Sequence, residues 1–174
     1  MAILYQAIAI ANWFIEKNLN DNSNLTHLKI QKLLYYIQGW YLAYFDCPLF
    51  EDNIEAWKYG PVIDSIYRSL RRYRDKEINK LIRGYAIING IYTITKPKVI
   101  FNNEKEEDFI LSFWNEFSKI PPWDLVNDTH KENTPWYQVS LAYENKKTTS
   151  KIIPVELMKS YFKSLLTESP TDRR

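Results

Sequence analysis

The sequence predicts an α+β fold that is predominantly α-helical, a compact helical domain with a small antiparallel β element. Several segments repeat apolar residues at the three- and four-residue spacing of a helix, and prolines and polar runs separate them. One Asn-Gly pair, at positions 89–90, lies between two short runs rich in Ile, Tyr and Thr, which is typical of a two-residue hairpin. The chain has 174 residues. This length suits one domain, which we expect over residues 1–166, with a disordered tail over 167–174.

The first helix is predicted over residues 3–18, and the polar run 18–24 is expected to end it as a loop. Its apolar face is made by residues at helical spacing: Ala7, Ile8, Ala11, Phe14 and Ile15.

The second helix is expected to begin after Thr26, a residue type that caps helix N-termini, and to reach about Asp46. Apolar residues surround it almost completely, so we expect a central helix that is packed on several sides. Gly39 weakens a helix by up to about 1 kcal/mol, which suggests that another element approaches closely there.

A short strand is expected over residues 54–59, where one set of side chains (Ile54, Ala56 and Lys58) alternates with another (Glu55, Trp57 and Tyr59). Gly60-Pro61 should break it, and Pro61 suits the first position of a third helix. That helix would bury Ile66 and Leu70 and carry arginines on another side, where Asp75 would partly neutralise them.

The predicted hairpin joins residues 86–88 to 91–94, and Pro97 should limit its second strand to an edge of a sheet or end it. Asn103 can cap the next helix, and the acidic run 104–108 is interpreted as the start of that helix, with a carboxylate cation site as the alternative. Further helices are expected over 123–127, over 136–144 and from Pro154, after a polar linker at 145–151.

Composition makes several function classes improbable. The net charge is +2, well below that of a typical nucleic-acid binder, and the four glycines form no phosphate-binding loop. Two histidines and one cysteine cannot build a common zinc site, so we expect no metal and no cofactor. The single cysteine and the lack of a long apolar run favour a cytoplasmic protein without a membrane span. No catalytic motif is present, and we predict that the protein is not an enzyme.

Candidate partner-binding residues lie around the predicted break at Gly60. Aromatic residues make up 16% of the chain, and Tyr, Trp and Arg are enriched where proteins bind proteins. The alternatives are that these aromatics are core residues and that the arginines form a solvated face; a functional arginine face would dock an acidic protein or nucleic acid. The candidates are Trp57, Lys58, Tyr59, Arg68, Arg71 and Arg72.

Three segments carry a family resemblance. They are LKIQKLLYYIQGW at 28–40, EAWKYGPV at 55–62 after PLF at 48–50, and Thr129-His130 with Pro135-Trp136. In this order and spacing the chain resembles the Panacea-domain family of SocA-like antitoxins and GepA-type phage-associated proteins. The match extends over about residues 5–145. The motif positions, expected to be structural, are Lys29, Gln31, Lys32, Tyr35, Gln38, Gly39, Trp40, Gly60, Pro61, Thr129, His130, Pro135 and Trp136.

The resemblance implies an antitoxin of a type II toxin–antitoxin system that neutralises a cognate protein toxin, encoded nearby, by direct binding. It implies no catalytic residues. The alternative is a nucleic-acid-binding or phage-associated regulatory protein without a toxin partner. A nucleic-acid partner is less favoured because only the arginine group supports it. The oligomeric state is left open.

Overall fold

The computed structural model describes residues 4–167, and it confirms a predominantly helical α+β fold. The helices and strands follow one another along the chain with short connections. They are α1 (Ala7–Asp21), α2 (His27–Phe45), β1 (Glu55–Trp57), β2 (Gly60–Val62), α3 (Asp64–Leu70), the 3-10 turn η1 (Arg71–Tyr73), β3 (Gly84–Ile88), β4 (Ile91–Thr95), α4 (Glu104–Phe117), α5 (Pro122–Thr129), α6 (Pro135–Glu144) and α7 (Val155–Thr167).

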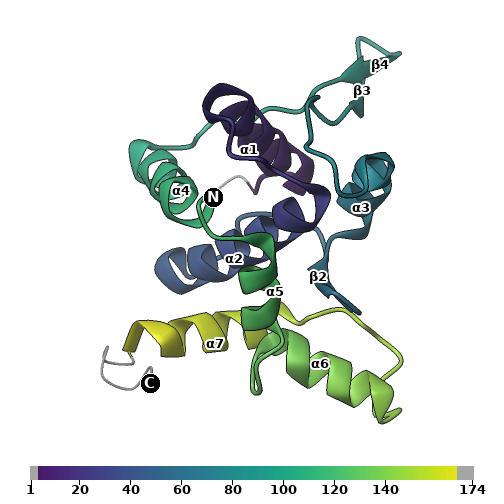
Figure 1. Ribbon diagram of the computed structural model, residues 1–174. Helices are drawn as coiled ribbons and strands as arrows, with labels where there is room; N and C mark the ends of the chain where they lie inside the picture. The colour runs from purple at the N-terminus through teal and green to yellow at the C-terminus, as the bar shows by residue number, and fades with distance from the viewer. Residues whose placement is uncertain (1–3, 168–174) are drawn as a thin grey trace.

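Helix α2 lies at the centre of the fold. In Figure 1, α1 and α4 lie on one side of it and α7 crosses on the other. The predicted cap is confirmed, because the Thr26 hydroxyl accepts a hydrogen bond from the Lys29 backbone N–H. The central position of α2 matches its nearly all-round apolar sequence, and most of its residues are buried.

The close approach expected at Gly39 is made by α7. A Cβ atom placed on Gly39 would lie 2.1 Å from the Phe162 ring, which is fully buried. Phe162 also contacts the rings of Tyr35 and Trp40 edge-on, at centroid distances of 5.7 and 5.1 Å. The Phe162 ring therefore fills the space that a side chain at position 39 would occupy.

The predicted first helix is wrong at both ends. It begins at Ala7, because Tyr5 instead donates its backbone N–H to Leu49 and forms a parallel bridge with Phe50; residue 3 lies outside the described part. It extends to Asp21, where Asn22 adopts a left-handed conformation (φ 52°) and ends it. The polar side chain of Asn18, expected in a loop, is buried and accepts the Leu25 N–H.

The role predicted for Pro61 is also wrong. The chain reverses at Lys58 and Tyr59, and Gly60, with φ +100°, begins β2, so that residues 60–62 pair with β1 and Pro61 lies opposite Ala56. The helix starts only at Asp64. The sequence did not reveal the tight turn after Trp57. A glycine at this position is compatible both with the end of a strand and with a turn that needs positive φ.

The second hairpin is confirmed. β3 and β4 pair from Gly84–Thr95 to Ile88–Ile91, and Asn89 and Gly90 both have positive φ, as a type I′ turn requires. The acidic run does start α4, with Asn103 as its cap and Glu106 buried, where it accepts hydrogen bonds from the hydroxyls of two tyrosines. Thr167, placed in the predicted tail, is the last residue of α7, and residues 168–174 lie outside the described part.

We predict that Gly39→Ala destabilises the fold by roughly 1–3 kcal/mol, because the new Cβ overlaps the buried Phe162 ring. Chemical denaturation of purified variants measures this. The loss should be much smaller when Gly39→Ala is made in a Phe162→Leu background, because the two positions are coupled through one space. Equal losses in both backgrounds would contradict the assignment; Ser160→Ala, on the exposed side of α7, is the control.

Candidate functional site

Two adjacent polar side chains of α2 form hydrogen bonds with the backbone of the β1–β2 hairpin and of the residue after it. The Lys32 ammonium is fully buried and donates to the Pro61 carbonyl at 2.8 Å. The Gln31 amide accepts the Ile63 N–H at 2.9 Å and its nitrogen lies 3.4 Å from the Ile63 carbonyl. A Cβ at Gly60 would lie 2.8 Å from the Lys32 Nζ atom, so glycine is needed for both the turn and the approach of the lysine.

The start of α6 and the end of α5 hold the same hairpin from another direction. The Trp136 indole N–H donates to the Trp57 carbonyl at 2.8 Å, and the His130 Nε2 atom lies 3.3 Å from the Lys58 carbonyl. The His130 and Trp136 rings are in contact, with centroids 3.8 Å apart. Thr129, which is buried, hydrogen-bonds to Val126 and precedes this histidine. Pro135 occupies the first turn of α6.

Other motif residues of α2 hold neighbouring loops in the same way. Gln38 accepts the backbone N–H groups of Leu49 and Phe50 and donates to the Phe50 carbonyl at 2.9 Å. Lys29 donates to the Ser118 carbonyl after α4. The motif positions Tyr35, Gly39 and Trp40 instead surround the Phe162 ring. Most of the resemblance therefore lies in side chains that fix backbone positions.

The hairpin loop opens onto a cavity of about 340 Å³ between α2, β1–β2 and α3. Trp57, Lys58 and Tyr59 all line it, and Tyr59 is largely exposed. Two residues that the sequence did not single out complete its wall. The Tyr67 ring packs between Trp57 and His27, each at a centroid distance of 4.9 Å. Trp57 is thus half-buried at the edge of the cavity and does not belong to the core.

One buried polar atom in the wall of the cavity has no partner among the described residues. His27 is buried, and its Nε2 atom has no hydrogen-bond partner within residues 4–167. Arg74 also lines the cavity and adopts φ 54° and ψ −112°, a backbone conformation that costs on the order of 1–3 kcal/mol for a residue with a side chain.

Burial changes the charge of this site. It lowers the pKa of the Lys32 ammonium to about 7, because the charged form is removed from water. Burial, followed by the charge of nearby Lys32, lowers the pKa of His27 to about 4. At neutral pH the cavity therefore holds an uncharged imidazole beside a lysine that is close to its midpoint.

The arginines do not form the single helical face that the sequence predicted. α3 ends at Leu70, so Asp75 lies in the turn beyond η1 and not on the same helix side. Arg68 pairs with Asp64 at 2.7 Å, and Arg71, the first residue of η1, is exposed. Arg72 lies over the Tyr73 ring and lines a second, separate cleft of about 600 Å³.

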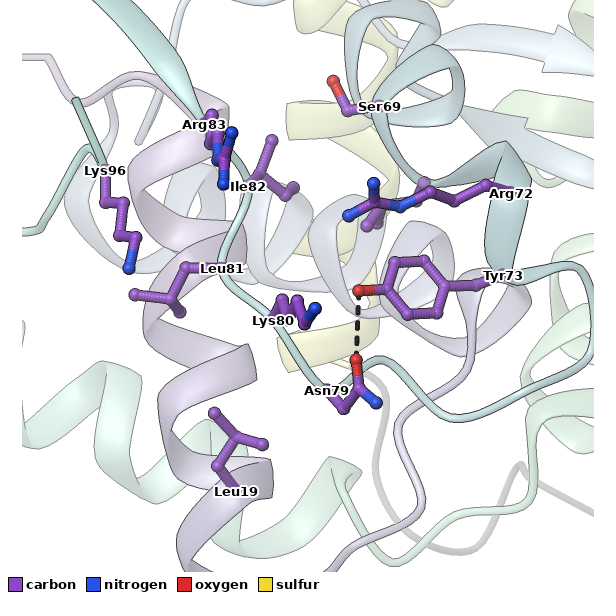
Figure 2. A pocket seen from close by; sticks show the side chains of 11 residues that line it. Leu19, Ser69, Arg72, Tyr73, Asn79, Lys80, Leu81, Ile82, Arg83 and Lys96 are labelled. Atoms are coloured by element: carbon purple, nitrogen blue, oxygen red, sulfur yellow. Dashed lines mark hydrogen bonds between the residues drawn. The ribbon is translucent and has the colours of Figure 1, made fainter. Parts of the chain in front are cut away.

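That cleft is basic, and Figure 2 shows Arg72 and Tyr73 on one side of it and Arg83 and Lys96 on the other. Lys80 completes the cationic lining. Lys80, Arg83 and Lys96 carried no joint signal in the sequence because they are spread over 17 positions. The pairing of β3 with β4 brings Arg83 next to Lys96, and Lys80 lines the same cleft.

No group of three or more His, Cys, Asp or Glu side chains in residues 4–167 is arranged to hold a metal ion. None of the described helices is both long and apolar enough to cross a membrane.

The chain belongs to the family described as Antitoxin SocA-like, Panacea domain, which matches residues 30–137, from α2 into α6. It is similar to Antitoxin SocA of Caulobacter vibrioides (strain NA1000 / CB15N), with 29% identity over 131 residues, 75% of this chain and 68% of that protein. No solved structure gives a significant match. Membership supports an antitoxin-like role and favours a non-enzymatic one.

We predict that Gln31→Leu lowers the free energy of unfolding by roughly 2–4 kcal/mol, because it leaves the Ile63 N–H and carbonyl without their partner. Denaturant titration followed by tryptophan fluorescence measures the loss. Gln138→Leu, which removes an exposed glutamine that contacts one carbonyl, is the matched control and should change stability little. Comparable losses in the two variants would mean that the Gln31–Ile63 hydrogen bonds make no specific contribution to the free energy of unfolding.

We also predict that His27 makes the fold less stable in mild acid. Its folded pKa is about 4, below the unfolded value of 6.5, so the unfolded state takes up a proton first and stability falls as the pH falls below 6.5. The unfolding free energy of His27→Phe should therefore decline less between about pH 7 and about pH 5 than that of the wild type. Tyr44→Phe, an exposed change on α2, should keep the wild-type slope, and the same slope for all three proteins would disprove the assignment.

Proposed function

We propose that the protein is an antitoxin of a type II toxin–antitoxin pair, which neutralises a toxin encoded nearby by binding it directly in the cytoplasm. The surface proposed for this binding is the β1–β2 loop with Trp57, Lys58 and Tyr59, together with the cavity beside it. The proposal extends this surface along α3 and η1 to Arg68, Arg71 and Arg72. Membership of an antitoxin family and the resemblance to Antitoxin SocA support it.

One structural observation carries the choice of surface. The carbonyl groups of Trp57, Lys58 and Pro61 all meet buried donors or ring nitrogens from α2, α5 and α6. The backbone of the loop is fixed on two sides, while its side chains face the cavity or solvent. A loop that is already ordered loses little conformational entropy on binding, so more of its contact energy appears as affinity.

The side chains of the loop also suit a protein partner. Trp and Tyr combine a large apolar area with a polar tip, and such residues dominate the energy of protein interfaces. The Lys58 ammonium lies 5.4 Å from the centre of the Tyr59 ring, which holds a positive charge at the rim of the cavity.

Co-expression tests this function. The neighbouring gene is induced in cells with and without this chain, and growth and co-purification are recorded. Growth arrest by the neighbour, rescue by this chain, and a stable complex are the expected results. A harmless neighbour that does not co-purify would contradict the proposal and favour a regulatory protein without a toxin partner.

We predict that Trp57→Ala combined with Tyr59→Ala weakens toxin binding at least about tenfold and reduces rescue, because both changes remove contact area at the centre of the proposed surface. Calorimetry or biolayer interferometry on the purified pair measures affinity. Trp123→Ala on α5 is a matched control, because Trp123 is also largely exposed (59%) but lies outside the cavity lining. Equal affinities for all variants, with the fold intact, would place the interface elsewhere.

A further inference from the structure

The β3–β4 hairpin turns its large apolar side chains away from the body of the protein. Residues directly opposite in an antiparallel pair share one face, and Tyr85 pairs with Ile94 and Ile87 with Tyr92. These four side chains form one face, which is 59–76% exposed. On the opposite face, Gly84, Ala86, Thr93 and Thr95 are small or weakly polar and half-buried, whereas Ile88 and Ile91, next to the turn, are 49% and 67% exposed.

This arrangement is the reverse of an ordinary sheet, which buries its apolar face. Figure 1 shows the hairpin projecting from the body beyond α1 and α3, with no other labelled element over it. An isolated two-stranded hairpin is only marginally stable in water, and contiguous exposed apolar patches mark interaction sites. The Tyr85 and Tyr92 rings are 6.0 Å apart, so the patch is continuous across both strands.

The base of the same face is basic. Arg83 directly precedes β3, and Lys96 directly follows β4. Both are exposed, and the alternation of side chains along the strands puts them on the same face as Tyr85 and Ile94. They line the cleft in Figure 2 together with Arg72 and Lys80. None of these four cations forms an ion pair with a residue that the structure describes, and the sequence from 78 to 103 contains no Asp or Glu.

We propose that this face, the outer hairpin face, defined by Tyr85, Ile87, Tyr92 and Ile94 with Arg83 and Lys96 at its base, is a second protein-docking surface. Its occupant is an extended, acidic segment of a partner protein that carries alternating apolar side chains. Such a segment pairs with a free edge of the hairpin, places its apolar side chains on the exposed face and aims its carboxylates at the basic cleft.

The charge pattern selects this occupant over two others. A second copy of the chain would bring two sets of unpaired cations together, which like-charge repulsion opposes. A nucleic acid would satisfy the cations, but its phosphate surface would leave Ile87 and Ile94 exposed to water. Arg72 belongs both to the basic cleft and to the end of the surface proposed above. The outer hairpin face itself shares no residue with the cavity at the β1–β2 loop, so variants of the hairpin test this inference separately from the proposed function.

The test uses the full chain and a fluorescein-labelled peptide of roughly 12 residues. Valine and threonine alternate over the length of one strand, and glutamates follow at the end that reaches the cleft. Fluorescence anisotropy should show saturable binding that weakens at least about fivefold between about 50 and about 300 mM NaCl. A peptide in which lysine replaces glutamate should not bind.

Two variants divide the surface into its parts. Arg83→Glu with Lys96→Glu should weaken the binding of the acidic peptide at least about tenfold, and so should Tyr85→Ser with Tyr92→Ser. Lys105→Glu with Lys119→Glu, both exposed on or just after α4, makes the same change in net charge and should bind like the wild type. Circular dichroism and thermal unfolding confirm that each variant is folded.

Four outcomes would overturn the inference. The acidic peptide fails to bind, or the Lys105/Lys119 control loses binding as strongly as the hairpin variant. Sedimentation shows a dimer that Tyr85→Ser with Tyr92→Ser dissociates, which would make the occupant a second copy. Duplex DNA binds more tightly than the peptide and depends on Arg83 and Lys96, which would make the surface a nucleic-acid site.

Discussion

The hydrogen bonds from Lys32 and Gln31 to the β1–β2 hairpin are the constraint on which the rest of this structure depends. A buried ammonium is unfavourable unless it is hydrogen-bonded or loses its proton, and here the Pro61 carbonyl and a lowered pKa both reduce that penalty. The same interaction requires glycine at position 60, because any Cβ would collide with the lysine. This contact therefore accounts both for the glycine at the start of β2 and for the position of the lysine.

The contacts of Trp136 and His130 complete this constraint from the opposite side. They explain how two distant segments, the loop at 57–61 and the start of α6, become parts of one site. Each of them meets a backbone carbonyl and so leaves the loop side chains free. Buried polar networks of this kind specify one geometry because every unmade hydrogen bond in them is expensive. The loop is rigid because of its backbone partners, and its chemistry is set separately by Trp57, Lys58 and Tyr59.

The two hairpins of the fold contrast in their surroundings. β1–β2 is held by three helices and presents a few side chains next to a cavity, whereas β3–β4 projects with an apolar face uncovered. The first arrangement offers pre-organised contacts, and the second offers an edge and a surface that association would stabilise. These are the two surfaces that we propose for binding a partner, and their chemistry differs.

Local patterns in the sequence by themselves determined much of the fold. The cap at Thr26, the type I′ turn at Asn89-Gly90 and the close approach at Gly39 depend on neighbouring residues or on one missing side chain, and all three are present. The start of α1 and the reversal at Gly60 were mispredicted, because a bridge from Tyr5 to Phe50 and a buried lysine decide them from far along the chain. The sequence also singled out Trp57, Lys58 and Tyr59, but only the tertiary structure brought His27, Lys32 and Tyr67 to them. It likewise separated Arg72 from Arg68 and joined it to Arg83 and Lys96. Such groupings depend on how elements pack over long separations, and no local periodicity records that packing.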